Sequence, residues 1–404
     1  MKRSALPLAC MLSAMLFSGR AALGRAQTPS AMPLHSLSVV GNWGADLSPD
    51  GRTVGVATLR RYPPPGASLP DEFVNVETWD FRAKRRLAQR LLAHRPIYTP
   101  MTSEWGQVRY TGDGRTLLVY DGELLHVLEA STLQEIKRID LGLPPFPRAD
   151  SVTDLAAPQS ITGRAAMWFS RGGGHGGSVR VYDLQRGDLV RRWDFDRGYP
   201  EFGSHVAWSP NGKQLAVTLL PVMPGGAFSP STTTLEILDV ASGRELREIQ
   251  TGYLPGALSY VGANRVVTAT VEMPWKAPYR IQAIRFWDVS TGQMTGKIEM
   301  APDGIRGSLA VSANDRCIVG YIGREYGESA LTDPWATISI IEQRFTVWDT
   351  QTGRVLATSP RIMPNIPKRP YLRLDAHGEL ALVFWSFPGS PILVYELPSS
   401  PPAR

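Results

Sequence analysis

Cysteine is almost missing from this sequence, which has only two in 404 residues. One of them, Cys10, lies in an apolar segment near the N-terminus, so a chain that loses this segment keeps Cys317 alone. Cys317 lies in the apolar run CIVGYI, where a buried and inert thiol is the expected state. Without a disulfide, packing and closure of the chain must hold the fold together.

Motifs for several kinds of chemistry are also missing. The sequence has no G-x-S-x-G of a serine hydrolase, no C-x-x-C-H of a c-type haem site and no D-x-D-x-D-G of a calcium loop. No two of its six histidines have the spacing of a local metal site. The loop RGGGHGG around His175 could approach a phosphate or carboxylate, but it lacks the strand-to-helix context of a nucleotide-binding loop. The sequence therefore predicts no cofactor and no metal site, and it favours a protein without enzymatic activity.

Helical periodicity is absent beyond the first residues, whereas glycine and proline are frequent, with 38 and 33 residues. This composition indicates an all-β chain with many turns. Basic residues form one short cluster, RAKRR at 82–86, which falls on a predicted turn and lacks interleaved aromatic residues. We interpret it as a solvated turn and predict no binding of nucleic acid.

Residues 1–26 are typical of a secretory signal peptide. Lys2 and Arg3 precede an apolar stretch at residues 5–17, and Gly24-Arg25-Ala26 offers small residues for cleavage. The stretch is too short to span a bilayer comfortably. Its removal would take away four basic residues and no acid, so the net charge would fall from +6 to +2. We expect an exported protein, periplasmic or secreted, that does not span a membrane after cleavage, with residues 27–33 as a short linker.

What the sequence has in quantity is a repeat. An alternating run ends in an aromatic residue or leucine followed by an acid, and a turn with a second alternating run follows. This is the pattern of two antiparallel strands joined tightly, and the clearest copy is IRFWDVSTGQMTGKIEM at 284–300. Seven such pairs occur, 47 to 61 residues apart, and their clearest markers are Trp79, Asp80, Asp183, Asp239, Trp287, Asp288, Trp348 and Asp349.

A second marker precedes most of these pairs. It is clearest as SPDGR at 48–52, TGDGR at 111–115 and SPNGK at 209–213. Proline presets φ and glycine supplies a left-handed corner, so the marker predicts a hairpin turn. Each repeat is then strand, tight turn, strand, variable connection, strand, tight turn and strand. Repeats of about this length are typical of propellers, solenoids and arrays.

The Trp-Asp endings and the hairpin markers resemble those of WD-repeat and related YVTN-type β-propellers, over nearly all of residues 35–398. The resemblance implies one domain, residues 34–398, that is a seven-bladed β-propeller of four-stranded antiparallel blades, followed by a short tail at 399–404. The Gly-His dipeptide that WD-repeat proteins often carry near a blade's start is missing from the start of every repeat. Their Asp-His-Ser/Thr-Trp hydrogen-bond network therefore cannot be transferred to this sequence.

The two ends of the repeat region complement each other. Residues 34–40 alternate like a strand before the first repeat, whereas the seventh repeat ends in SSPPAR without a fourth strand. We expect the N-terminal strand to complete the last blade, which would remove an open sheet edge.

The variable connections between the second and third strands of the repeats open onto one rim of a propeller, its top face, which we call the loop face. Insertions on one face of a repeat array usually mark its binding face. Tryptophan, tyrosine and arginine are enriched at binding hot spots. With His175 they give the candidate binding residues Arg60, Arg61, Tyr62, His175, Trp275, Arg324, Tyr326, Trp335 and Trp385. For Trp275 and Trp335, pinning their own loops to the rim is an equal alternative.

The favoured function is that of an exported, non-enzymatic scaffold that binds a protein, a peptide or an envelope polymer through the loop face. The alternative is a propeller enzyme, similar to a lactonase or a quinoprotein, with a metal or cofactor in the central funnel. That alternative needs acids, amides or histidines that converge on the inner strands. A third possibility is a permanent accessory subunit of an envelope complex.

Overall fold

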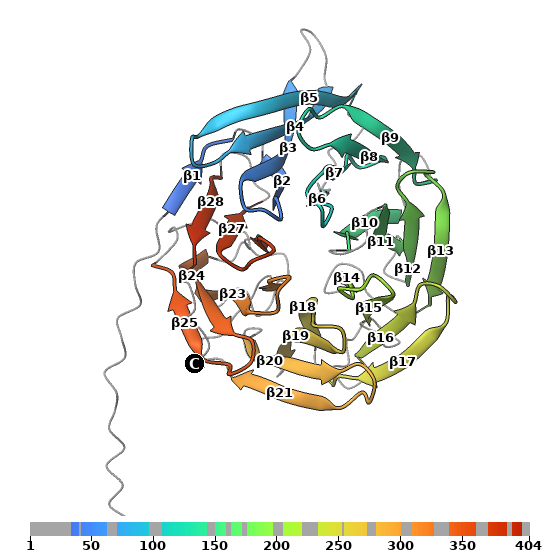
Figure 1. Ribbon diagram of the computed structural model, residues 1–404, viewed down its shortest axis with the longest axis vertical. Helices are drawn as coiled ribbons and strands as arrows, with labels where there is room; N and C mark the ends of the chain where they lie inside the picture. The colour runs from blue at the N-terminus through green and yellow to red at the C-terminus, as the bar shows by residue number, and fades with distance from the viewer. Residues whose placement is uncertain are drawn as a thin grey trace, which may run out of the picture.

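A computed structural model describes residues 34–39, 42–62, 71–96, 107–143, 150–158, 163–171, 176–196, 205–219, 233–252, 254–272, 280–299, 309–326, 339–360, 371–385 and 390–397. These residues form seven four-stranded antiparallel sheets arranged in a ring (Figure 1). They include no helix that is long and apolar enough to cross a bilayer. The predicted seven-bladed β-propeller is confirmed.

The first four blades follow the chain without interruption. Their strands are β2 (Asn42–Leu47), β3 (Thr53–Tyr62), β4 (Asp71–Asp80) and β5 (Arg85–Pro96) in blade 1; β6 (Gln107–Tyr110), β7 (Thr116–Tyr120), β8 (Leu124–Glu129) and β9 (Glu135–Asp140) in blade 2; β10 (Asp150–Ala156), β11 (Arg164–Arg171), β12 (Gly177–Asp183) and β13 (Leu189–Phe195) in blade 3; and β14 (Val206–Trp208), β15 (Gln214–Leu219), β16 (Thr234–Asp239) and β17 (Glu245–Gln250) in blade 4.

Blades 5 and 6 are built in the same order, and blade 7 uses both ends of the chain. The strands are β18 (Leu254–Val261), β19 (Arg265–Glu272), β20 (Arg280–Asp288) and β21 (Met294–Glu299) in blade 5; β22 (Leu309–Val311), β23 (Cys317–Tyr326), β24 (Ser339–Asp349) and β25 (Val355–Thr358) in blade 6; and β26 (Tyr371–Leu374), β27 (Leu380–Phe384), β28 (Ile392–Glu396) and β1 (Leu34–Leu37) in blade 7.

The N-terminal strand closes the ring as the sequence predicts. β1 pairs antiparallel with β28, with Leu34 opposite Tyr395 and Leu37 opposite Ile392. Leu37 is buried with apolar residues of blades 7 and 1. Its side chain therefore stabilises the contact between the last blade and the first as well as the sheet of the last blade.

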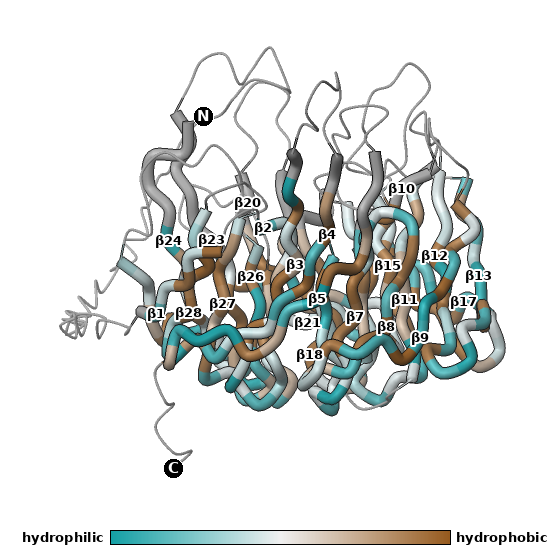
Figure 2. Tube along the Cα trace, turned by 90° about the horizontal axis from the view of Figure 1, so that it is seen from above, coloured by the Kyte–Doolittle hydropathy of each residue, from teal (hydrophilic) through white to brown (hydrophobic). Residues whose placement is uncertain are grey.

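Apolar clusters join each blade to the next. Seven clusters of buried side chains are present among the described residues, and each combines residues of two adjacent blades. Figure 2 shows these apolar positions along the strands, with the hydrophilic tight turns gathered at one end of the ring. We call that end the turn face. It lies opposite the loop face because each strand of a blade runs antiparallel to its neighbour.

The acidic residue of the repeat marker caps the turn between the third and fourth strands. In five blades an aspartate Oδ1 accepts a hydrogen bond from the backbone N–H three residues later; these aspartates are Asp80, Asp183, Asp239, Asp288 and Asp349. Hydrogen bonds from the hydroxyls of Ser290 and Thr291 and from the Thr291 N–H lower the pKa of Asp288 to about 2. The marker aspartates therefore have a local structural function.

The tryptophans of the marker pack between strands or bond within their own blade. Trp287 and Trp348 are buried, and the Trp287 indole N–H donates to the hydroxyl of Thr268 on β19 at 3.0 Å. The Trp79 indole N–H donates to Glu77 at 2.8 Å on its own strand. These residues support the blades and do not form a common site.

Candidate functional site

Charged side chains gather on the inner strands of consecutive blades. Figure 1 shows that β2, β6, β10 and β14 lie around the centre of the ring. Asp46 lies on β2, Arg109 on β6 and Asp154 on β10, while Arg373 lies on β26 of blade 7. His205 directly precedes β14 of blade 4. We call these residues the channel network.

Acidic side chains alternate with arginine and histidine side chains along the channel network. Arg373 Nε lies 3.8 Å from Asp46 Oδ1, and Arg109 Nη2 lies 3.7 Å from Asp154 Oδ1. His205 Nδ1 lies 3.7 Å from Asp154 Oδ2. The network therefore crosses four blade boundaries, from blade 7 through blade 1 to blade 4.

Each carboxylate of the network also binds the backbone of a following blade. Asp46 Oδ2 accepts the N–H of Tyr110 at 2.8 Å, and Asp154 Oδ2 accepts the N–H of Val206 at 3.1 Å. Asp46 and Asp154 thus connect inner strands that the sheet hydrogen bonds do not join.

Burial and charge shift the pKa values of the network in different directions. Burial raises the pKa of Asp46 above its ordinary value, although both neighbouring arginines oppose the shift. Burial acts in the same sense on Asp154, but His205 and Arg109 outweigh it and the pKa of Asp154 is lowered. Burial, followed by the like charge of Arg109, lowers the pKa of Arg373 to about 10.

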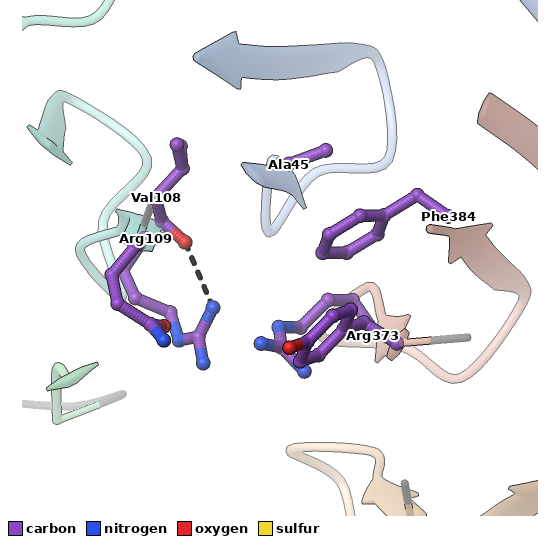
Figure 3. A pocket seen from close by; sticks show the side chains of 7 residues that line it. Ala45, Val108, Arg109, Arg373 and Phe384 are labelled. Atoms are coloured by element: carbon purple, nitrogen blue, oxygen red, sulfur yellow. Dashed lines mark hydrogen bonds between the residues drawn. The ribbon is translucent and has the colours of Figure 1, made fainter. Parts of the chain in front are cut away.

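A small cavity lies between the two arginines. It is lined by residues of blades 7, 1 and 2, namely Ala45, Gln107, Val108, Arg109, Tyr371, Arg373 and Phe384. Figure 3 shows the guanidinium groups of Arg109 and Arg373 directed toward each other across this space. Its volume of about 10 Å³ is close to the minimum that holds one water molecule. Within the described parts of the chain, no three histidine, cysteine or acidic side chains are grouped to hold a metal ion.

Most of the sequence-predicted binding residues lie near the loop face, but the structure describes few of their side chains. Arg60 is half-buried on β3. Arg61 and Tyr62 also belong to β3, while Arg324 and Tyr326 belong to β23. The expectation that Arg60 and these four residues lie in loops is wrong, because both strands continue and pair with the next strand up to Tyr62 and Tyr326. His175, Trp275 and Trp335 fall outside the described residues.

Trp385 requires a correction. Its side chain is 0% exposed and packs among buried residues of blades 6 and 7. Asn42 Nδ2 donates to its carbonyl oxygen at 3.2 Å. Trp385 is therefore a core residue between blades 6 and 7, its carbonyl oxygen is bonded to blade 1, and its side chain offers no surface to a ligand.

Sequence reasoning missed the channel network. Asp46, Arg109 and Arg373 each lie two positions before the residue that opens a hairpin turn, which is Ser48, Thr111 or Asp375. At this position Arg109 and Arg373 line the small cavity, and Asp46 lies beside Arg373. The recurrence of charge at this position is a signal that the sequence contains.

No family model and no curated protein matches this chain. Solved structures match it over almost its whole length. A chain of the crystal structure of the mitotic checkpoint complex has 14% identity and a TM-score of 0.56, with 99% of both chains covered. The Myceliophteria thermophila Cps50 (Swd1) beta-propeller domain has 9% identity and a TM-score of 0.58, with 91% of this chain and 100% of that chain covered. The likeness at these identities is one of fold.

Proposed function

We propose that this protein is an exported, non-enzymatic binding scaffold that holds a protein or peptide partner on its loop face. The observation that carries the proposal is the contrast between the two faces of the ring. On the turn face, described turns are short and capped by their own side chains, as at Ser48 and Asp288. On the loop face, the connections after β3, β15 and β23 differ in length, spanning residues 63–70, 220–233 and 327–338.

Variation in length on one face is typical of the binding face of a repeat protein. Self-capped turns offer few free backbone groups to a partner, which leaves recognition to the opposite rim. One similar solved structure is a chain of a multiprotein assembly, the mitotic checkpoint complex. This likeness supports the function of a scaffold for the present protein rather than that of an enzyme.

Alanine variants at the two faces test the proposal. The full chain, expressed with its N-terminal segment, is used to capture partners from an envelope fraction, and binding of the purified partner is then measured. Tyr62→Ala, Trp275→Ala and Trp335→Ala should each weaken binding by about 1–3 kcal/mol, the effect expected for truncating an anchor residue. Lys84→Ala and Arg354→Ala on the turn face are the matched controls. Equal binding by both sets would contradict the proposal.

Export has its own test. The mature N-terminus should lie near Gln27, and N-terminal mass spectrometry of periplasmic and culture fractions would establish it. A chain that begins with Met1 and stays in the cytosol would rule out export without bearing on the loop-face result.

A further inference from the structure

Two arginines from distant parts of the chain face the same small cavity. Arg109 comes from β6 of blade 2 and Arg373 from β26 of blade 7, with blade 1 between them. Their side chains are only 15% and 19% exposed. Burial and the like charge of Arg109 lower the pKa of Arg373, and Asp46 and Asp154 offset only part of the shift.

The two side chains are held in the same way. Arg109 Nη1 donates to the carbonyl oxygen of Val108 at 2.8 Å, and Arg373 Nη1 donates to that of Leu372 at 2.7 Å. Each guanidinium is thus fixed by the peptide that precedes it. The Arg109 contact appears as the dashed line in Figure 3. The remaining N–H groups of both arginines are presented in a constant orientation.

The carboxylates of the channel network do not satisfy these remaining donors. The distances of 3.8 Å from Arg373 to Asp46 and 3.7 Å from Arg109 to Asp154 exceed those of a hydrogen bond. Arg373 Nε is buried and has no hydrogen-bond acceptor among the described residues. A buried donor without an acceptor is unfavourable, and it is rare in folded proteins.

We propose that Arg109 and Arg373 together form a receptor for a single oxyanion group, a carboxylate or a phosphate, which enters the cavity between them. Guanidinium groups match the geometry of such groups, and their N–H donors bind them with charge-assisted hydrogen bonds. A cavity of about 10 Å³ accepts one oxygen atom rather than a whole ligand. Only one oxygen of the anion therefore enters it. The site does not depend on the loop-face residues, and either proposal can fail without the other.

Arginine-selective ¹⁵N NMR on the full folded chain tests this directly. Inorganic phosphate is one probe. The second is a short peptide that ends in glutamate with free carboxylates, compared with its neutral amide counterpart. Either oxyanion should shift the Arg373 Nε–H resonance in a saturable way. The resonance of Arg52, which is 81% exposed on a turn, is the internal control and should stay in place.

Conservative variants complete the test. Arg109→Lys and Arg373→Lys keep the positive charge but lose the planar guanidinium group, so the affinity for the probe that binds should fall at least tenfold. Arg52→Lys is the control and should leave this affinity unchanged. Melting curves without the probe verify the fold of each variant. Binding of phosphate alone would identify a free ion as the ligand, and binding of the acidic peptide but not the amide would identify a partner's carboxylate. No shift of Arg373 in the wild type with either probe, or equal affinity of the Arg109→Lys and Arg373→Lys variants, would overturn the proposal.

Discussion

His126 and Asp121 form a buried pair in blade 2, with His126 Nε2 3.0 Å from Asp121 Oδ2 and side chains only 1% and 2% exposed. The other oxygen of Asp121 accepts the N–H groups of Glu123 and Leu124, each at 2.8 Å. The carboxylate therefore closes the tight connection between β7 and β8. Blade 2 replaces a long loop at this point with a side-chain pair.

Asp121→Asn should lower the free energy of unfolding by about 1–3 kcal/mol, because it replaces the carboxylate oxygen that bonds to the buried His126 ring and leaves buried polar groups without their partners. Urea denaturation at neutral pH measures this effect. Asp188→Asn, at an exposed turn position, is the matched control and should change the stability little. Equal effects of the two substitutions would contradict a stabilising function for the pair.

The same pair predicts a dependence on pH. Burial would raise the pKa of Asp121, but the hydrogen bonds from His126 and from the N–H of Leu124 outweigh it, so the pKa lies below its ordinary value. The contribution of Asp121 is then complete above the unfolded pKa of about 3.9 and is lost as the pH falls through the folded value. The stability advantage of wild type over Asp121→Asn should shrink between about pH 5 and pH 2, and an advantage that grows on acidification would refute the assignment.

Leu37→Ala should destabilise the whole ring, although the residue lies in the first strand of the chain. Leu37 is 2% exposed between blades 7 and 1, and truncating a buried leucine costs about 2–5 kcal/mol. Ser38→Ala, at the exposed neighbouring position, is the control. Calorimetry should show one cooperative transition at a lower temperature. A variant that melts like wild type would mean that β1 does not hold the ring closed.

Two glycines with the same backbone conformation should respond differently to alanine. Gly378 and Gly142 have φ of +66° and +62°, where a Cβ costs roughly 1–2 kcal/mol. A Cβ on Gly378 would also lie 2.8 Å from Cys317 Sγ, whereas one on Gly142 would meet no atom within 4 Å. Gly378→Ala should therefore lower the free energy of unfolding by about 1–3 kcal/mol more than Gly142→Ala does. Chemical denaturation measures this difference. Equal losses would show that blades 6 and 7 are packed loosely there.

Lys84 lies in the turn between the third and fourth strands of blade 1. Blades 3 to 6 have glycine at the equivalent position, and the φ of Lys84 is +51°. Lys84→Gly should relieve this strain and raise the free energy of unfolding by up to about 1 kcal/mol. Lys84→Ala keeps the Cβ and should bring no such gain. A fall in melting temperature for the glycine variant would contradict this account.

The blades could be predicted from the sequence because the chemistry of a hairpin turn is local. Asp288 and Gly292 lie within one turn and define the two strands on either side. The channel network could not be predicted in the same way. Asp46 meets Arg109 and Arg373 through the geometry of the ring. Their shared position before a hairpin turn places each on an inner strand but does not indicate which of them come together.

The exposure of side chains at strand ends is the second feature that could not be predicted from the sequence. Trp385 follows β27 directly, and an aromatic residue at such a position can face either a neighbouring blade or the solvent. The neighbouring blade determines the outcome, and here Trp385 is buried. Similarly, β3 continues to Tyr62 because β4 pairs with it as far as Asp71, which the composition of one segment does not reveal.

The closure of blade 7 also constrains the order in which this protein is made. His35 Nε2 lies 3.5 Å from Glu396 Oε1, across 361 positions of the chain. During synthesis β1 leaves the ribosome long before β28, and until β28 is made β1 has no strand to pair with. The apolar faces of blades 6 and 1 that blade 7 covers are exposed over the same period. Contacts this distant in sequence form slowly, so the nascent chain needs protection from aggregation until translation has passed β28.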